Sequence, residues 1–289
     1  MKAYTIGLYE KAMPGTLSWK EKMLAAKKAG YDFIEISIDE TDEKLNRLEM
    51  SRDERIELLS LMFETGIPIR TMCLSGHRKY PLGSSDDATR ARGMEIMEKA
   101  ICLAEDLGVR IIQLAGYDVY YEEGSETTRA YFLENLRKAT EMASAKGILM
   151  GFETMETEFM NTVEKAMNYV KKVNSVYLNV YPDLGNITNA AVSYGKNVLD
   201  DLETGRGHLA AMHLKETVPG KFREIPYGTG HVDFESGIRK AWELGVRRYV
   251  TEFWYTGNPE WEKDLDFAVS KMTAILDEAA REEKSNENP

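Results

Sequence analysis

The sequence is poor in cysteine and contains no long apolar stretch. Its 289 residues include two cysteines, Cys73 and Cys102, so no disulfide framework is expected and a reducing cytoplasm is the predicted location. No apolar run approaches the roughly 18 residues of a membrane span. The N-terminus, MKAYTIGLYEKAMPG, lacks the apolar core of a signal peptide. We therefore predict a cytoplasmic protein with no membrane partner.

The chain also has fewer basic than acidic residues. The chain has 37 basic and 48 acidic residues, and its net charge of -11 disfavours a nucleic-acid partner because the phosphates would be repelled. A small phosphorylated ligand is not excluded, since it needs only a local basic pocket. Residues 284–289 form a polar tail that we predict to be disordered. No low-complexity linker divides residues 1–283, which we predict to be one domain.

Eight short runs rich in Ile, Val, Leu and Tyr alternate with amphipathic stretches, as buried parallel strands alternate with helices. The predicted strands are 3–9, 32–38, 68–74, 110–115, 147–153, 176–181, 208–214 and 248–253. The predicted helices are 19–29, 52–65, 86–107, 125–146, 162–173, 195–204, 234–244 and 260–282. The repeated unit, and the lack of GxGxxG after the first strand, favour a (β/α)8 TIM barrel over an open doubly wound sheet.

Four potential metal ligands lie at the ends of the last four predicted strands: Glu153, Asp183, His213 and Glu252. They are 30, 30 and 39 residues apart, which is the length of one strand–helix unit. In a parallel barrel such side chains point into one mouth, where active sites lie. Three oxygens and one nitrogen suit one divalent metal ion, which can be Mn²⁺, Co²⁺, Zn²⁺ or Mg²⁺.

Each of these residues alone has an ordinary alternative role, because barrel ends often carry helix caps and salt bridges. Agreement of four residues on consecutive strands favours the metal site. Three other histidines are present. His208, at the start of the seventh strand, is predicted to be structural. His231 lies in the loop GTGHVDF, either near the site or exposed to solvent.

In the four potential metal ligands and their spacing, the sequence resembles the xylose isomerase-like TIM barrels. More closely it resembles the L-ribulose-5-phosphate 3-epimerases, also called L-xylulose-5-phosphate 3-epimerases, of the bacterial L-ascorbate and pentose pathways. The resemblance runs from residue 7 to the last helix. The segments MCLSGHR and IQLAGYDVYY are specific to this subfamily, whereas the four ligands indicate only the superfamily. Further segments are DETDEKLNRL, YPDLGN, HLKET and PYGTGHVDF.

The resemblance implies the reaction. Glu153, Asp183, His213 and Glu252 are expected to bind the metal, and Glu153 and Glu252 to serve also as the acid/base pair. One glutamate would remove the proton at C3 of a 2-ketopentose 5-phosphate, giving a cis-enediolate held by the metal, and the other would return a proton to the opposite face. L-Ribulose 5-phosphate and L-xylulose 5-phosphate would thereby interconvert. The family pattern has a hydrophobic residue and an aspartate at the positions of Thr154 and Glu156.

The phosphate of this substrate needs cationic or amide donors. The loop after the third strand, SGHRKYPLGSS, offers His77 and Arg78, with Ser75 beside them. The alternative is a solvated basic loop, and the resemblance favours the phosphate site. Lys215 follows His213 by two residues and faces the same mouth, so it is expected to bind substrate oxygens.

Aromatic and polar residues near the other strand ends have more than one interpretation. Tyr9 and Glu10 end the first strand and are candidates for lining the pocket. Gln113 is predicted to pack inside the barrel, although its position in the strand also allows a role in the site. Three tyrosines after the fourth strand suit either an aromatic lid or a dimer contact: Tyr117, Tyr120 and Tyr121.

Alternative functions on the same barrel remain open. An aldose–ketose isomerase would move hydrogen between C1 and C2, and a ketose 3-epimerase could act on unphosphorylated sugars. A DNA-repair endonuclease would need a multi-zinc site and a basic groove, which four histidines and a charge of -11 disfavour. A non-enzymatic sugar-binding barrel would not need both glutamates. Related enzymes suggest a homodimer.

Overall fold

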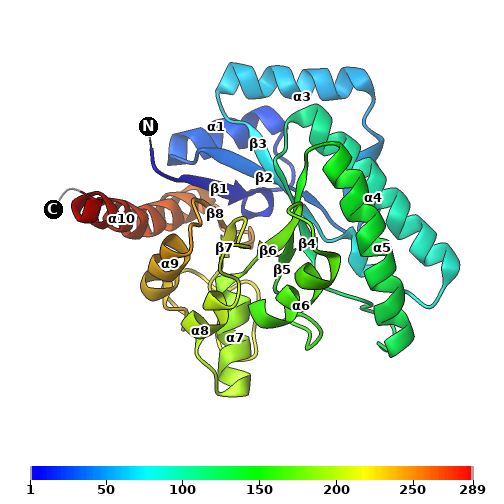
Figure 1. Cartoon of the computed structure of the whole chain (residues 1–289). Coiled ribbons are helices and arrows are strands. Elements are labelled where there is room, and N and C mark those ends of the chain that lie inside the picture. The colour runs from blue at the N-terminus through cyan, green and yellow to red at the C-terminus, as the bar shows by residue number, and fades with distance from the viewer. Residues whose placement is uncertain (1, 288–289) are drawn as a thin grey trace.

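The computed structural model describes residues 2–287 and contains a barrel of eight parallel strands (Figure 1). The strands are hydrogen-bonded in the order β6-β5-β4-β3-β2-β1-β8-β7, and every pair is parallel. All eight lie within the predicted ranges, so the predicted barrel is confirmed. Their bounds are Thr5–Tyr9 (β1), Phe33–Ile38 (β2), Ile69–Leu74 (β3), Ile111–Ala115 (β4), Leu149–Glu153 (β5), Leu178–Tyr181 (β6), Met212–Leu214 (β7) and Arg248–Thr251 (β8).

The barrel is closed between β6 and β7 by single bridges instead of a continuous ladder. Val180 pairs with Leu209, and Asp183 pairs with His213. The backbone amide of His213 donates to the carbonyl of Pro182 at 2.9 Å. This closure brings Asp183 and His213 side by side, although 30 residues separate them in the sequence.

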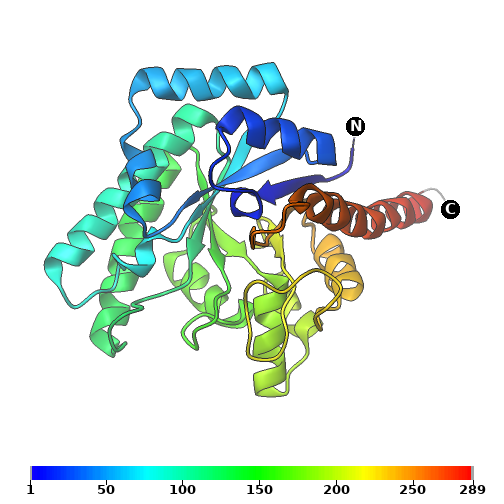
Figure 2. The same ribbon diagram turned by 180° about the vertical axis from the view of Figure 1, so that it is seen from behind.

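The helices surround the sheet, and both ends of the chain lie on the same side of the molecule (Figures 1 and 2). Within residues 2–287, none of the helices combines the length and the apolar character needed to cross a membrane. The helices are Trp19–Ala29 (α1), Asp42–Leu45 (α2), Arg52–Thr65 (α3), Asp87–Leu107 (α4), Glu126–Ala145 (α5), Val163–Val173 (α6), Leu184–Tyr194 (α7), Val198–Glu203 (α8), Phe234–Glu243 (α9) and Trp261–Glu287 (α10). Short 3₁₀ turns cover Glu10–Ala12 (η1), Asn46–Glu49 (η2) and Gly76–Arg78 (η3).

Local signals in the sequence set the ends of several helices. Ser18 caps α1 through a capping box with Glu21, in which each residue's side chain accepts a hydrogen bond from the other's backbone amide. Ser51 caps α3 in the same way with Glu54. Gly30 ends α1 in the left-handed conformation, at φ 101°, which an L-residue rarely adopts. These local signals explain why α1 and α3 match their predicted ranges.

Alternation along the strands separates two layers of side chains. Ile34, Ile36 and Ile38 of β2 belong to the large apolar core that includes helical residues. Phe33 of the same strand belongs to a smaller cluster inside the barrel, with Tyr9, Cys73, Ile111, Tyr181, Ala211 and Val250. By the same parity Glu35 also points inward. The interior is thus apolar at one end and increasingly polar toward the carboxyl ends of the strands.

Two predicted segments need correction. Helix α7 was missed, because LGNITN at its start contains glycine and asparagine, which have low helix propensity. The predicted helix 195–204 is the shorter α8, preceded by the α7 cap Gly195. Helix α10 continues through Glu287, so residues 284–287 of the predicted disordered tail are helical. Residues 288 and 289 lie outside the described residues.

The start of α7 packs tightly against the strand end that carries Lys215. A Cβ atom at Gly185 would lie 2.6 Å from the carbonyl oxygen of Lys215. We predict that Gly185→Ala lowers the free energy of unfolding by about 1–3 kcal/mol, because the backbone must shift. Urea unfolding followed by circular dichroism measures this loss.

Gly15→Ala is the matched control. Apart from Gly15 itself and its two chain neighbours, no described residue has a heavy atom within 4 Å of a Cβ atom at this position. This control should change the free energy of unfolding by less than about 0.5 kcal/mol. Equal stabilities for the two variants would contradict the close packing of α7 against this strand end.

Candidate metal centre and active site

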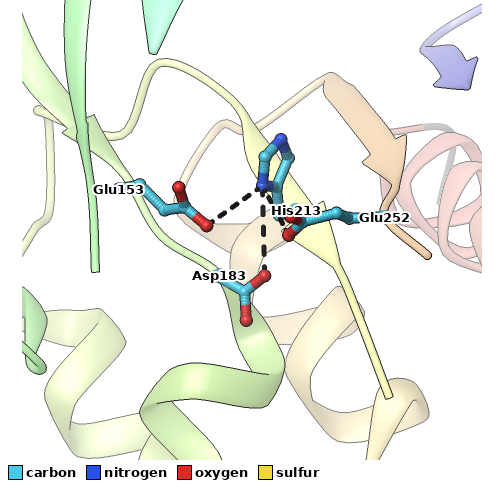
Figure 3. A group of neighbouring side chains, drawn as sticks. All are labelled: Glu153, Asp183, His213 and Glu252. Atoms are coloured by element: carbon cyan, nitrogen blue, oxygen red, sulfur yellow. Dashed lines mark ion pairs between the residues drawn. The ribbon is translucent and has the colours of Figure 1, made fainter. Parts of the chain in front are cut away.

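Four side chains from consecutive strand ends meet at the carboxyl end of the barrel (Figure 3). One ligand atom from each of Glu153, Asp183, His213 and Glu252 lies within 4.8 Å of all the others. His213 Nδ1 is 3.0 Å from Glu252 Oε2, 3.5 Å from Glu153 Oε1 and 3.9 Å from Asp183 Oδ2. The structure therefore brings together all four residues that the sequence pattern selected. These four residues are called the quartet below.

Three of the converging atoms are buried without a hydrogen-bond partner in the described part of the chain. They are Asp183 Oδ2, His213 Nδ1 and Glu252 Oε2. Buried polar atoms normally have hydrogen-bond partners, so three without one in the same place indicate a site for a ligand. A divalent cation bound between them would satisfy all three, and three oxygens with one nitrogen are a suitable donor set. The residues present thus fit a metal ion.

Secondary structure positions Asp183, which follows β6, and Glu153, which ends β5. Asp183 is the N-cap of α7, and its Oδ1 accepts a hydrogen bond from the amide of Asn186 at 2.6 Å. Oδ2 is thereby left for the quartet. Glu153 is the last residue of β5, and the side-chain amide of Gln113 on β4 donates to its Oε2. Gln113, predicted to pack inside the barrel, does so while holding a ligand.

Burial and crowding move the pKa values of the carboxyl groups apart. Burial, together with the charge of Glu252, raises the pKa of Glu153. Burial also raises the pKa of Asp183 well above its usual range. Burial opposes ionisation of Glu252 as well, but Lys215 and His213 outweigh it and hold the pKa of Glu252 below its usual value. Carboxyl groups whose pKa values diverge in this way are suited to divided acid and base roles.

Lys215 joins the quartet from the β7 side. It is buried, and its Nζ lies 3.2 Å from Asp183 Oδ2 and 3.5 Å from Glu252 Oε2. Burial alone would lower the pKa of Lys215, but the neighbouring carboxylates outweigh burial and raise it. Lys215 is therefore an ammonium ion that offsets part of the negative charge of the quartet.

A cavity opens outward from the quartet to the rim of the barrel. It is lined by residues that the sequence predicted (Tyr9, Ser75, Arg78, Glu153, Lys215 and Glu252) and by others that it did not (Lys11, Asp39, Glu40, Thr41, Cys73, Met155, Glu156, Asn186, Phe222, Arg223 and Trp254). Ser75 and Arg78 therefore share one cavity with Glu153 and Glu252. Glu10 does not line it: this carboxylate is fully buried and accepts a hydrogen bond from Arg47.

Arg78 has few partners for a half-buried guanidinium group. Its Nε has no hydrogen-bond partner among the described residues, and its Nη2 lies 3.4 Å from the hydroxyl of Tyr117. The nearest carboxylate oxygen, on Glu40, is 3.8 Å away. The guanidinium stacks 4.9 Å from the ring centre of Tyr120. Arg78 is thus held in place while part of its donor capacity remains unused.

His77 is not part of the cavity, which corrects the prediction. Its side chain is buried on the other side of η3, where Nε2 hydrogen-bonds to the carbonyl of Gly93 on α4 at 3.0 Å. Burial lowers the pKa of His77 to about 4. The side chain is therefore neutral near pH 7 and anchors η3 to α4 instead of binding an anion.

Glu156 is the centre of a polar cluster at the rim. It accepts hydrogen bonds from Tyr117 at 2.7 Å and from Arg223 at 3.1 Å. Arg223 comes from the long loop between β7 and α9, which is yellow in Figure 2 and also contacts α7 through Asn189 and Lys221. Neither Arg223 nor Lys11 belongs to a recognisable motif, so sequence reasoning missed both.

Comparison with protein families agrees with the fold described above. Residues 23–271 match the family described as xylose isomerase-like TIM barrel. The chain is 44% identical over 254 residues to the L-ribulose-5-phosphate 3-epimerase UlaE of Shigella boydii serotype 18, covering 88% of each protein. The protein of the same name from Escherichia coli O157:H7 shows the same identity and coverage.

Solved structures confirm the fold. A D-tagatose 3-epimerase-like protein aligns with a TM-score of 0.78 at 17% identity, covering 96% of this chain and 99% of that one. An L-ribulose 3-epimerase aligns with a TM-score of 0.77 at 17% identity, covering 97% of each. At this level of identity the likeness concerns the fold alone.

The buried position of His77 predicts a specific dependence of stability on pH. Its folded pKa of about 4 lies below the ordinary value of 6.5, so its contribution to stability is complete above pH 6.5 and is lost as the pH falls toward 4. The full loss should be roughly 3 kcal/mol. His77→Gln, which keeps a donor for Gly93 but cannot titrate, should lack this loss.

Urea unfolding of both proteins at several pH values between 7 and 4 provides the test. Other titrating groups are common to both proteins, so the difference between the two curves isolates His77. Parallel curves over the whole range would contradict the buried, neutral state of this histidine.

Proposed function

The chain belongs to the L-ribulose-5-phosphate 3-epimerases among the xylose isomerase-like TIM barrels, and we propose that it interconverts L-ribulose 5-phosphate and L-xylulose 5-phosphate. The observation that carries this proposal is the convergence of Glu153 and Glu252 from different walls on one buried site. In the closed barrel, two strands separate β5 from β8 on one side and four on the other. Inversion of a carbon centre needs proton transfer on both of its faces.

The proposed acid/base chemistry belongs to the two glutamates. One carboxylate removes the proton from C3, leaving an enediolate, and the other carboxyl group delivers a proton to the opposite face. The pKa of Glu153 is raised and that of Glu252 is lowered, and such opposite directions suit divided acid and base roles. Two successive transfers invert C3 and leave the number of protons on the enzyme unchanged.

A divalent metal held by Glu153, Asp183, His213 and Glu252 would polarise the C2 carbonyl and stabilise the negative charge that develops on the substrate oxygens. Lys215 supports this role, since its ammonium group lies beside Asp183 and Glu252 and faces the cavity. The four ligand side chains are buried, and the lower dielectric constant around buried groups strengthens these electrostatic interactions.

Arg78 is the proposed phosphate ligand. It lines the same cavity as Glu153 and Glu252. Its Nε has no hydrogen-bond partner among the described residues, and the nearest carboxylate oxygen is 3.8 Å away. A guanidinium binds phosphate oxygens through two parallel hydrogen bonds. Ser75 lies beside it, and Lys11 and Arg223 add positive charge at the rim. His77 is not part of the proposed phosphate site, because its ring is bonded to the carbonyl of Gly93.

Deuterium incorporation tests the proposed reaction. Incubation of the metal-loaded enzyme with L-ribulose 5-phosphate in D₂O should place deuterium at C3 as L-xylulose 5-phosphate forms. We predict that Glu153→Gln and Glu252→Gln each lower the rate by at least about 10²-fold, because one face of C3 then lacks its acid or base. Nuclear magnetic resonance of the sugar products measures both position and rate.

Circular dichroism and metal content establish whether each variant remains folded and loaded. Label at C1 would instead indicate an aldose–ketose isomerase. Full activity in either variant would refute the role of that glutamate, and no turnover of any ketopentose phosphate would refute the proposed function.

The phosphate site gives a second prediction. Arg78→Ala should raise KM for L-ribulose 5-phosphate by at least about tenfold, because the variant loses one charge-assisted hydrogen bond to the phosphate. The KM for unphosphorylated L-ribulose should change little. Lys79→Ala is the matched control, because Lys79 belongs to the same loop but does not line the cavity. An equal change for both sugars in Arg78→Ala would show that Arg78 does not bind the phosphate.

The cellular location, the oligomeric state and the identity of the metal ion remain predictions. Cys73 and Cys102 are both unpaired, which agrees with the predicted cytoplasmic location. A homodimer and a place in L-ascorbate degradation rest on the resemblance. The donor set is compatible with Mn²⁺, Co²⁺, Zn²⁺ or Mg²⁺.

A further inference from the structure

We propose that Glu35 is a positioning residue that orients His213 so that Nδ1, and not Nε2, binds the metal. Glu35 lies on β2, while His213 lies on β7, three positions away in the sheet order. Both side chains are fully buried, and Glu35 Oε1 is 2.6 Å from His213 Nε2. This inference rests on the proposed metal site and concerns a residue outside the quartet.

The chemistry of the two groups determines where the imidazole proton lies. A carboxylate has only acceptor atoms, so the hydrogen bond requires the proton to be on Nε2. A neutral imidazole carries one proton, and Nδ1 then presents a lone pair. That atom faces the three carboxylate oxygens of the quartet at 3.0, 3.5 and 3.9 Å (Figure 3). Glu35 therefore selects the form of His213 that can bind a cation at this point.

The second oxygen of Glu35 is fixed as well. The hydroxyl of Tyr181 on β6 donates to Glu35 Oε2 at 3.0 Å. The ring of Tyr181 also packs edge-on against the His213 ring, with centres 4.8 Å apart. A buried carboxylate is costly unless its oxygens are hydrogen-bonded. Here both oxygens are used, so Glu35 cannot turn away without losing partners, and the imidazole plane is held in one orientation.

The charge on Glu35 also matters for metal affinity. A carboxylate at Nε2–H increases the electron density at Nδ1 and strengthens its bond to a cation. Gln in its place would have a similar shape but no charge. Its amide could also donate to Nε2, which would shift the imidazole proton to Nδ1 and block the ligand atom. Such partners of metal-binding histidines typically contribute about 10–100-fold to metal affinity.

The test is Mn²⁺ binding to the full-length metal-free protein, measured by isothermal titration calorimetry. Glu35→Gln should weaken binding by about 10–100-fold. Glu10→Gln is the matched control. It removes another fully buried carboxylate, whose partners among the described residues are Ser37, Arg47, Lys22 and Lys44 and not the quartet. This control should stay within about threefold of the wild type. Tyr181→Phe removes the second partner of Glu35 but keeps the ring beside His213, so it should weaken Mn²⁺ binding less than Glu35→Gln does.

The outcomes separate this inference from the proposed function. Wild-type affinity in Glu35→Gln, or an equal loss in Glu10→Gln, would overturn the positioning role and leave the metal site intact. A wild type that binds no Mn²⁺ would overturn both. Unfolding temperatures of the metal-free variants distinguish a loss of affinity from a loss of fold.

A measurement on the wild type avoids dependence on the variant's folding. The chain has four histidines, so histidine-selective ¹⁵N labelling gives a simple spectrum. In the Zn²⁺-loaded protein, one imidazole should show a metal-bound Nδ1 and a proton on Nε2 that exchanges slowly with water. Metal binding through Nε2 of this residue, or rapid exchange of its proton, would overturn the inference.

Discussion

The structure depends on gathering three carboxylates around one imidazole inside a buried space. Two like charges 4 Å apart repel by several kcal/mol at the effective dielectric of a protein surface, and by more when buried. This repulsion has to be compensated. The buried ammonium of Lys215 offsets part of it, and the donor set suits a divalent cation that would offset the rest. The same crowding shifts the pKa values of Glu153 and Glu252 in opposite directions, which suits divided acid and base roles.

The arrangement of charges around the cavity differs from what the net charge of the whole molecule suggests. The net charge of -11 would repel a phosphorylated substrate at long range. Close to the cavity, Lys11, Arg78 and Arg223 provide positive charge, but Asp39 and Glu156 already pair with the first and last of these. Arg78 differs because aromatic rings hold it and no carboxylate lies within hydrogen-bonding distance. A small anion can therefore be recognised by one preorganised group without a basic surface.

The sequence predicted the parts of the site that depend on local order. Buried strands are visible as apolar runs, and polar residues at the carboxyl ends of parallel strands lie near the mouth of the barrel. Position and spacing therefore predicted Glu153, Asp183, His213 and Glu252. Glu35 could not be found in this way, because its proposed role comes from a hydrogen bond to His213, which lies 178 residues away in the sequence. Arg223 was hidden for a similar reason: the path of a long loop depends on contacts with α7 and Glu156 that no local pattern encodes.

His77 and Arg78 show why a cluster of basic residues in the sequence need not act together. Both lie in the 3₁₀ turn η3, where consecutive side chains diverge by about 120° because three residues complete one turn. Arg78 points into the cavity, and His77 points away from it, to the carbonyl of Gly93. Burial of a neutral His77 anchors the turn to α4, and that anchor fixes the direction of Arg78. The histidine thus supports the proposed phosphate site by holding the backbone and not by contributing charge.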